Sequence, residues 1–192
     1  MRRRAFLGIF LLPLARGQAC APTPALTEGP YYLRGVPERE DLREGLPGVP
    51  LRLLLRVRDR ACRPLEGARV DLWHTDALGR YSGVNAPGTF CRGWQATDER
   101  GEVAFLTLFP GWYPSRTPHL HLRVEAAGRV FATQLFFPEE VQREVYALPP
   151  YRERGMPRVN NRQDGFFRAD LLLRLEREGE GFLGAFVLTL PG

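Results

Sequence analysis

Two of the three histidines in the chain lie one residue apart, in the segment HLHLRVE at residues 119–125. Alternate residues of a β-strand point to the same face, so His119 and His121 are expected to share one face. The apolar residues between and after them would then pack in the core. Two imidazoles on one face can bind a single metal ion, and the alternative is a pair of surface histidines on an edge strand.

Few other residues can complete such a site. A three-histidine zinc site would have to use His74, the remaining histidine of the chain. His121 and Glu125 fit a cupin-like pattern on a β-strand, but a cupin also uses a histidine from a later strand, and none follows His121. A cupin-like metal protein that depends on Glu125 therefore stays as an alternative.

Tyrosine is the other candidate ligand. Tyr113 lies shortly before His119 in a loop bracketed by proline and glycine, and Tyr81 follows the turn DALG at residues 76–79. A phenol has a pKa near ~10 and binds a metal as phenolate, a form that a hard trivalent ion favours. Two phenolates and two neutral imidazoles suit Fe(III) better than Zn(II) or Fe(II).

Four segments resemble the intradiol ring-cleavage dioxygenases, in particular the small exported members of that family. These segments are TEGPYY (27–32), PLEGARVDLWHTDALGRYSG (64–83), RGWQATDERGEVAFLTLFPGWYPSRTPHLHLRV (92–124) and TQLFFPEE (133–140). The resemblance implies a β-sandwich with a mononuclear non-haem Fe(III) centre. It also implies small aromatic diols and O2 as substrates, with cleavage of catechol-type rings to muconate-type diacids.

The resemblance assigns roles to individual residues. The family's four iron ligands correspond in this chain to Tyr81, Tyr113, His119 and His121. Because Tyr113 lies in a loop, we expect it to be the ligand that leaves the metal when substrate binds. Arg116 matches the family's active-site arginine, which would stabilise negative charge on the ring. Gln134 matches a polar residue beside the substrate.

Two further polar residues lie near the predicted ligands in sequence. His74 is not among the family's ligands, so we expect it to have a structural role or to support a ligand. Asp76 is expected to cap the turn that precedes Tyr81.

Short apolar segments separated by Gly, Pro and Asp predict an all-β fold, an antiparallel β-sandwich with long loops and one short helix. The expected strands are residues 51–57, 68–74, 102–109, 119–125, 129–137, 168–175 and 181–190. Residues 138–148 predict the helix, with Pro138 and two glutamates at its start. Residues 149–166 are expected to form a long loop.

The N-terminus has the pattern of an export signal. Arginines at positions 2–4 precede an apolar run at residues 7–15, and small residues follow at Gly17 and Ala19. This run is much shorter than the ~20 residues that a membrane-spanning helix needs. We therefore predict a cleaved, twin-arginine-like signal at residues 1–19 and export to the periplasm or the extracellular space.

The remaining chain divides into two parts. Residues 20–50, rich in proline and glycine, are expected to form an extended N-terminal arm, and residues 51–192 a catalytic β-sandwich domain. A lipid anchor on Cys20 is a weaker alternative to a simple signal. Three cysteines, Cys20, Cys62 and Cys91, allow three pairings with one cysteine left over, and the sequence does not choose among them.

Charge excludes one class of partner. The net charge of +5 falls to 5 − 4 = +1 without the predicted signal, which contains four arginines and no acid. A basic surface for nucleic acid is therefore not expected.

The sequence is compatible with more than one activity and more than one oligomeric state. A β-sandwich binding module that has kept the fold without catalysis is the alternative to an enzyme. Catechol-specific family members have a large helical N-terminal region that helps to form a dimer, whereas only residues 20–50 precede the first strand here. The sequence therefore does not decide whether the chain forms a homo-oligomer. Nor does it name the aromatic diol, because the arm and residues 149–166 are expected to line the pocket.

Overall fold

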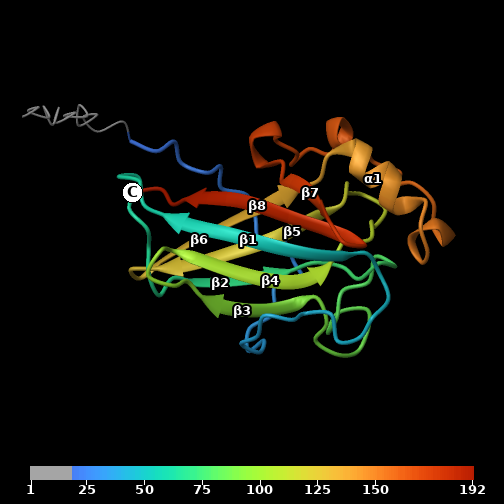
Figure 1. Cartoon of the computed structure of the whole chain (residues 1–192), viewed down its shortest axis with the longest axis horizontal. Coiled ribbons are helices and arrows are strands. Elements are labelled where there is room, and N and C mark those ends of the chain that lie inside the picture. The colour runs from blue at the N-terminus through green and yellow to red at the C-terminus, as the bar shows by residue number, and fades with distance from the viewer. Residues whose placement is uncertain (1–18) are drawn as a thin grey trace, which may run out of the picture.

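The computed structural model describes residues 19–192, which form a sandwich of two four-stranded sheets (Figure 1). In spatial order the first sheet contains β4 (Glu102–Leu108), β1 (Pro50–Arg58), β8 (Gly181–Thr189) and β7 (Arg174–Glu178). The second sheet contains β3 (Arg92–Ala96), β2 (Arg69–Trp73), β5 (His119–Ala126) and β6 (Arg129–Phe136). The predicted all-β sandwich is confirmed. The signal predicted at residues 1–19 lies, apart from Ala19, outside the described residues.

Alternating side chains of both sheets fill the space between them. The inward-facing residues of β1 are almost completely buried, and they are Leu51, Leu53, Leu55 and Val57. They belong to one core cluster with Leu72 of β2 and Leu122 of β5. Each such side chain contributes about 1.5–3 kcal/mol when it is removed from water. Because these side chains point into the core, the residues next to them on each strand must point to the outer face of the sheet.

One strand pair departs from the antiparallel sandwich that the sequence predicted. β8 pairs with β1 in parallel, with Leu51 opposite Phe182 and Leu55 opposite Phe186. Parallel neighbours need a long connection, and here the connection includes the whole second sheet. The alternation of a strand predicts which residues are buried, but not the end from which the strand enters its sheet.

Two strand predictions need correction. β3 was not expected, because Gly93 and Gln95 interrupt the apolar pattern, yet it pairs along its whole length with β2. The strand predicted at residues 168–175 is wrong for most of its length. Ala169–Leu171 form a 3-10 turn, and β7 begins only at Arg174. Leu171 in the turn and Leu173 after it are buried without forming a strand, so an apolar run was mistaken for a strand.

The predicted helix and loop both lie at one end of the sandwich (Figure 1). The helix expected at residues 138–148 is α1 (Glu139–Tyr146), which begins after Pro138 with two glutamates in its first turn. The loop expected at residues 149–166 contains two 3-10 turns, at Tyr151–Glu153 and Asn161–Gln163. Within residues 19–192 no helix combines the length and the apolar character needed to cross a bilayer.

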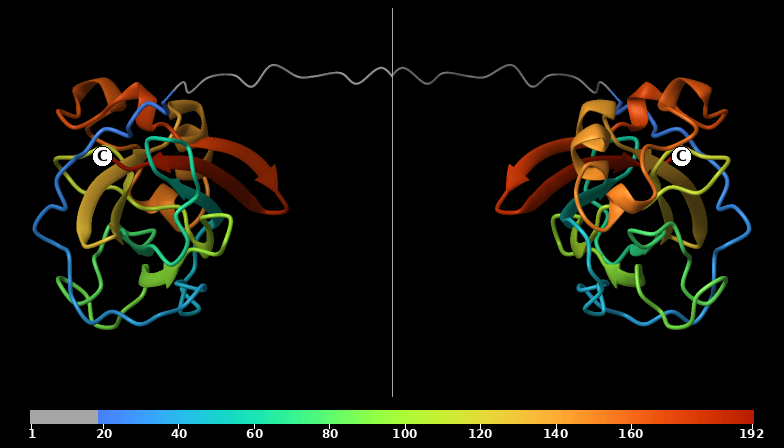
Figure 2. Two further views of the ribbon diagram at one scale, coloured as in Figure 1. Left: turned by 90° about the vertical axis from the view of Figure 1, so that its left-hand side faces the viewer. Right: turned by 90° about the vertical axis from the view of Figure 1, so that its right-hand side faces the viewer.

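The N-terminal arm runs along the outside of the second sheet and past its edges (Figure 2). The backbone N–H of Leu26 donates to Ala132 of β6 at 2.9 Å, and that of Arg39 donates to Trp94 of β3 at 3.1 Å. Further along, the N–H of Leu42 donates to Leu106 of β4 at 2.9 Å. The arm therefore covers strand edges that would otherwise be unpaired, and it shields the outer face of the second sheet from solvent.

A disulfide joins the start of the arm to the sandwich. Cys20 pairs with Cys62, 42 residues further along the chain, while Cys91 is a buried free thiol. Of the three pairings that the sequence allowed, the structure contains the one between Cys20 and Cys62. The bond also occupies the Cys20 thiol that a lipid anchor would need.

Reduction of this disulfide should destabilise the protein. Closing a loop of this length stabilises the folded state by about 4 kcal/mol in the chain-entropy description. We expect the urea midpoint of unfolding to fall when a reductant is present. The Cys20→Ser/Cys62→Ser double variant should show the lower midpoint with or without reductant. An identical midpoint for the parent protein in both conditions would contradict this account.

Candidate metal centre

The two histidines of β5 lie on the outer face of the second sheet. Leu120 and Leu122 are fully buried in the core, so His119 and His121 point the other way. Each of the two histidines is nevertheless only 3 % exposed. Their Nε2 atoms are 3.0 Å apart. The predicted shared face is confirmed, whereas the alternative of surface histidines on an edge strand is wrong, because β5 lies between β2 and β6.

Hydrogen bonds and ring stacking orient these imidazoles. Nδ1 of His119 lies 2.7 Å from the carbonyl oxygen of Thr117, so it is assigned as the protonated nitrogen and Nε2 keeps a lone pair. Trp73 of β2 stacks on His121, with ring centroids 4.9 Å apart and an interplanar angle of 9°. Nδ1 of His121 is buried without a hydrogen-bond partner among the described residues.

Burial keeps both imidazoles neutral. It lowers the pKa of His119 to about 3, with the charge of Arg116 as a further cause. It also holds the pKa of His121 well below its usual range, where the neighbouring His119 adds to the effect. A neutral imidazole with a free lone pair is the form that binds a metal ion.

A capped turn positions Tyr81. Asp76 accepts backbone N–H groups of Leu78 at 3.0 Å and of Arg80 at 2.8 Å, so the predicted cap is confirmed. Tyr81 follows directly and is 2 % exposed. Its hydroxyl is buried without a hydrogen-bond partner among the described residues. Burial raises the pKa of the phenol well above its usual value, and the adjacent Tyr113 raises it further.

The loop that contains Tyr113 packs directly on this turn. The N–H of Gly111 donates to the carbonyl oxygen of Asp76 at 2.8 Å. A Cβ at position 111 would lie 2.5 Å from the carbonyl oxygen of Ala77, so only glycine allows this approach. The loop is held from the other side by Tyr146, whose hydroxyl donates to the carbonyl oxygen of Pro110 at 2.8 Å. The two tyrosine segments therefore have a fixed relative position.

The structure brings the four predicted ligands together. The hydroxyl of Tyr113 is 3.4 Å from Nε2 of His119. The ring of Tyr81 lies 5.7 Å from that of Tyr113 and 6.4 Å from that of His121, centroid to centroid. Donor atoms about 2.1 Å from one shared ion are themselves roughly 3.0–3.4 Å apart. The two donor-atom separations among Tyr113, His119 and His121, 3.4 Å and 3.0 Å, therefore fit a common ion, and the ring of Tyr81 lies beside them.

The cupin-like alternative does not agree with this geometry. Glu125 lies four residues beyond His121, which is about 13 Å along an extended strand. Its carboxylate is half-exposed and pairs with Arg123 at 3.1 Å. In the described part of the chain, no group of three or more His, Cys, Asp and Glu side chains is placed to hold a metal. A metal site at this cluster would therefore need tyrosine side chains among its ligands.

Arg116 and Gln134 lie beside the cluster and contact each other. Nη2 of Arg116 donates to Oε1 of Gln134 at 2.6 Å, and Gln134 is paired opposite His121 in the sheet. The amide of Gln134 donates in turn to the carbonyl oxygen of Thr27 in the arm at 3.0 Å. Gln134 is fully buried although β6 is an edge strand, because the arm covers it.

His74 is part of the interior and not of the cluster. Its Nδ1 lies 2.7 Å from the carbonyl oxygen of Thr75, and its Nε2 lies 2.7 Å from the hydroxyl of Thr107. Complete burial lowers the pKa of His74 to about 4. This agrees with a structural role, since both ring nitrogens already have partners within the protein.

Several neighbours of the cluster were not predicted from the sequence. Trp73 stacks on His121, and Tyr31 of the arm lies 4.7 Å from the ring of Tyr81. Arg92 lies 5.6 Å from the centre of the Tyr81 ring. Asp164 accepts a hydrogen bond from Arg116. Trp73, Tyr31 and Arg92 lie in the segments that resemble the dioxygenase family, so the resemblance could have pointed to them. Asp164 is in a loop without a recognisable pattern.

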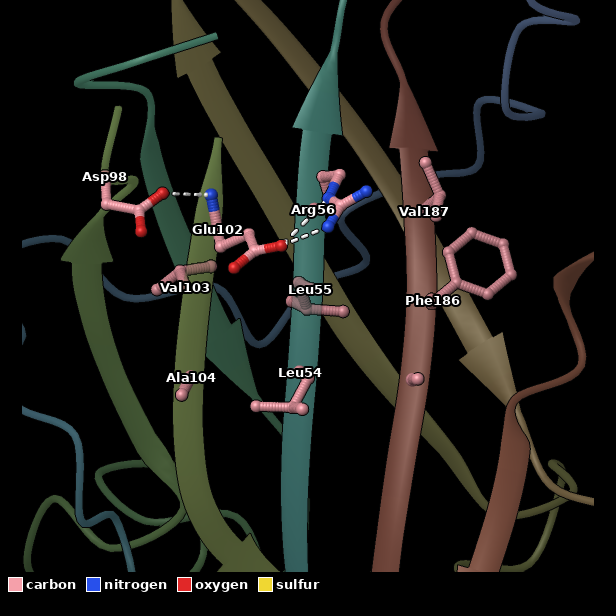
Figure 3. A pocket seen from close by; sticks show the side chains of 10 residues that line it. Leu54, Leu55, Arg56, Asp98, Glu102, Val103, Ala104, Phe186 and Val187 are labelled. Carbon is pink, nitrogen blue, oxygen red and sulfur yellow. Dashed lines mark hydrogen bonds and ion pairs between the residues drawn. The ribbon is translucent and has the colours of Figure 1, made fainter. Parts of the chain in front are cut away.

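A separate groove of about 540 Å³ lies elsewhere, on the other sheet (Figure 3). Leu54, Ala104 and Val187 line it, and the pair Arg56 and Glu102 lies at one side. None of its lining residues is a tyrosine or a histidine. We therefore place the candidate chemistry at the tyrosine and histidine cluster and not at this groove.

Acidification should destabilise the metal-free protein. The folded-state pKa values of the histidines lie below the usual value of about 6.5, so the unfolded chain takes up these protons first. The contribution of the neutral histidines to the free energy of unfolding is therefore fully present above that pH. It falls as the pH decreases toward 4. Between pH 7 and pH 5 the expected loss is about 2 kcal/mol for each of the three histidines. Urea unfolding at both pH values measures it, and a His74→Gln variant should lose about a third less. Equal stability at both pH values would contradict the assigned burial effect.

Comparison with known proteins gives the family. The family described as Dioxygenase (Dioxygenase_C) matches residues 27–144, more than half of the chain. Chlorocatechol 1,2-dioxygenase from Rhodococcus opacus is 30 % identical over 137 residues, covering 59 % of this chain and 53 % of the relative. The chain thus spans about half the length of the curated relatives that it matches.

Solved structures extend the similarity over nearly the whole chain. An intradiol ring-cleavage dioxygenase from Tetranychus urticae is 33 % identical with a TM-score of 0.82, covering 90 % of this chain and 94 % of that one. The dioxygenase domain of a dioxygenase and carbohydrate-binding fusion from Streptomyces sp. SirexAA-E is 37 % identical with a TM-score of 0.73, covering 89 % and 99 %. The chain therefore belongs to the intradiol ring-cleavage dioxygenase family, and in extent it matches the family's small single-domain members.

Proposed function

We propose that the protein is an exported, mononuclear non-haem Fe(III) dioxygenase that opens catechol-type aromatic rings between their two hydroxyl groups. O2 is the second substrate, and muconate-type diacids are the products. The observation that carries this proposal is the convergence of two phenols and two imidazoles from separate segments, in the order and context of the family. The curated relatives act, by their names, on catechol, chlorocatechol and hydroxyquinol, and the choice among such diols is left to experiment.

The donor set supports iron in its ferric state. Tyr81, Tyr113, His119 and His121 would hold the ion, two as phenolates and two as neutral imidazoles. The hydroxyl of Tyr81 is buried and unpaired among the described residues, a costly arrangement unless a bound cation compensates it. When bound, a ferric ion would supply Lewis acidity that favours deprotonation of a catechol.

The two tyrosines would have different tasks. Tyr81 is fixed by the Asp76 turn and almost fully buried, so it would remain in place throughout the reaction. Tyr113 lies in a loop and is only half-buried. It is therefore the phenol that can swing away and accept a proton from the incoming diol. Burial raises the pKa of the Tyr113 phenol, and the nearby charge of Arg116 opposes this rise, which would help that group to alternate between its two forms.

Arg116 would stabilise negative charge that develops on the ring. Its guanidinium is only 11 % exposed, so its field is weakly screened at the cluster. Gln134 would hold one side of this guanidinium through its side-chain oxygen. Arg116 would act through its charge and Gln134 through its position, and neither would form a covalent bond with the substrate.

We also propose export by the twin-arginine route, on the residues of the predicted signal. The disulfide between Cys20 and Cys62 supports an oxidising destination, because such bonds are rare in reducing compartments. A route that carries folded proteins would suit a metal loaded before transport.

Oxygen uptake with defined aromatic diols tests the proposed activity. The iron-loaded protein should be red-brown and should consume O2 with at least one of catechol, hydroxyquinol, protocatechuate or a chlorinated catechol. Product analysis should find a ring-opened diacid. A colourless protein that binds no iron and consumes no O2 would instead support a β-sandwich binding module that has kept the fold.

The assignment of Tyr81 can be tested against its neighbour Tyr31. Tyr81→Phe should abolish or shift the visible absorption of the iron-loaded protein, because a phenolate bound to Fe(III) gives rise to it. Tyr31→Phe removes a hydroxyl from an adjacent ring, 4.7 Å away, and should leave the visible spectrum unchanged. Identical spectra for both variants and the parent would remove Tyr81 from the proposed ligands.

A further inference from the structure

Asp164 is a fully buried acid beside Arg116, in the long loop between α1 and β7. Its Oδ2 accepts from Nε of Arg116 at 2.8 Å and from the backbone N–H of Thr117 at 2.9 Å. Its Oδ1 accepts from the N–H of Phe166 at 2.9 Å. The side chain of Asp164 is 0 % exposed. Three donors therefore fix this carboxylate in one position, with no water needed to satisfy it.

The loop that carries Asp164 is itself held firmly. Asn160 caps the short turn at Asn161–Gln163, with a reciprocal hydrogen bond between Asn160 and Gln163. The side chain of Asn161 accepts from the hydroxyl of Thr117 at 2.7 Å and donates to the carbonyl oxygen of Phe137 at 2.9 Å. The turn is thus attached to the segment that leads into β5. Asp164 and Arg116 consequently belong to one rigid unit.

Arg116 is held on three sides. Nε bonds to Asp164, Nη2 bonds to Gln134, and the ring of Phe166 lies 4.6 Å from Cζ. The cluster is close by on the chain and in the sheet: the backbone N–H of Arg116 donates to the carbonyl oxygen of Tyr113 at 3.1 Å, and Gln134 is paired opposite His121. An arginine without these contacts would sample many rotamers. A catalytic charge is effective only when it is oriented before the reaction.

From these contacts we propose that Asp164 is a positioning residue, which holds the guanidinium of Arg116 in the orientation in which it faces the tyrosine and histidine cluster. The inference rests on the proposed function, in which Arg116 stabilises charge on the ring. Asp164 does not touch the cluster, and it acts through Arg116. The loop at residues 149–166 therefore contributes to catalysis by holding Arg116, through the carboxylate of Asp164 and the ring of Phe166.

A double-mutant cycle on the iron-loaded enzyme tests the coupling. Arg116→Ala should keep iron and colour and lose about 10²-fold in turnover. Asp164→Asn should also keep iron, with a loss of at least ~10-fold in kcat and little change in KM. The double variant should be no slower than Arg116→Ala alone, because the carboxylate has no target once the arginine is gone. Losses that multiply, or an Asp164→Asn variant with parental kcat, would overturn the proposal.

A measurement on the metal-free protein gives a readout independent of activity. The Nε–H of Arg116 should exchange slowly with solvent in the parent, and its NMR signal is identified by its loss in Arg116→Ala. Asp164→Asn should speed this exchange by at least ~10-fold, since the acceptor charge is removed. Asp71→Asn is the matched control, because it changes a buried acid that pairs with a different arginine, Arg69, at 2.8 Å. Unchanged exchange in Asp164→Asn would contradict the positioning role.

These outcomes separate the two levels of the proposal. If no diol is turned over, the proposed function fails while the exchange experiment still reports on Asp164. If Asp164→Asn does not fold, Asp164→Glu keeps the buried charge and moves it by one methylene. We then expect about 10-fold slower turnover with full iron content. Parental turnover in that variant would count against a positioning role.

Discussion

The alternation of side chains along β5 is the constraint on which the site depends. Leu120, Leu122 and Val124 are fully buried between the sheets and fix the register of the strand. A slip of one residue would bring the imidazoles into the core and the leucines out of it. The same register places Trp73 and Gln134 on either side of His121. Packing of the apolar core and geometry of the polar cluster are therefore two results of one pattern.

Burial of this outer face has opposite effects on the two kinds of donor. It lowers the pKa of His119 and raises that of Tyr81, so both are neutral in the metal-free protein. A neutral imidazole can bind a metal at once, whereas a neutral phenol must first lose its proton. Only a strong positive charge favours that loss in a dry site. The charges of Arg116 and Arg92 both lower the pKa of Tyr81, but burial still dominates. A trivalent ion would provide the larger compensation.

The sequence predicted the parts of this site that follow from local pattern. Strand periodicity placed His119 and His121 on one face, the turn before Tyr81 was recognised from Asp76, and α1 from its proline and glutamates. Contacts that depend on tertiary position could not be obtained in this way. The parallel pairing of β8 with β1, the stacking of Trp73 and the approach of Asp164 all join residues that are distant in sequence. The strand predicted at residues 168–175 failed because apolar residues are buried equally well by a 3-10 turn.

The N-terminal arm is as much a part of the site as the sheet that it covers. Arg92 of β3 donates from Nη1 to the carbonyl oxygen of Tyr31 at 2.6 Å and from Nε to that of Ser82 at 2.9 Å. It therefore joins the arm to the residue that follows Tyr81. Arg92 is 1 % exposed, and among residues 19–192 it forms no ion pair with a carboxylate and its Nη2 has no hydrogen-bond partner. A buried cation without an acid is costly, and the ring of Tyr81, whose phenol could become negative, lies 5.6 Å from Cζ of Arg92. Ionisation of Tyr81 should therefore stabilise the buried charge of Arg92, and Arg92 in turn binds the arm. A bound cation that favours ionisation of Tyr81 would consequently stabilise the arm as well.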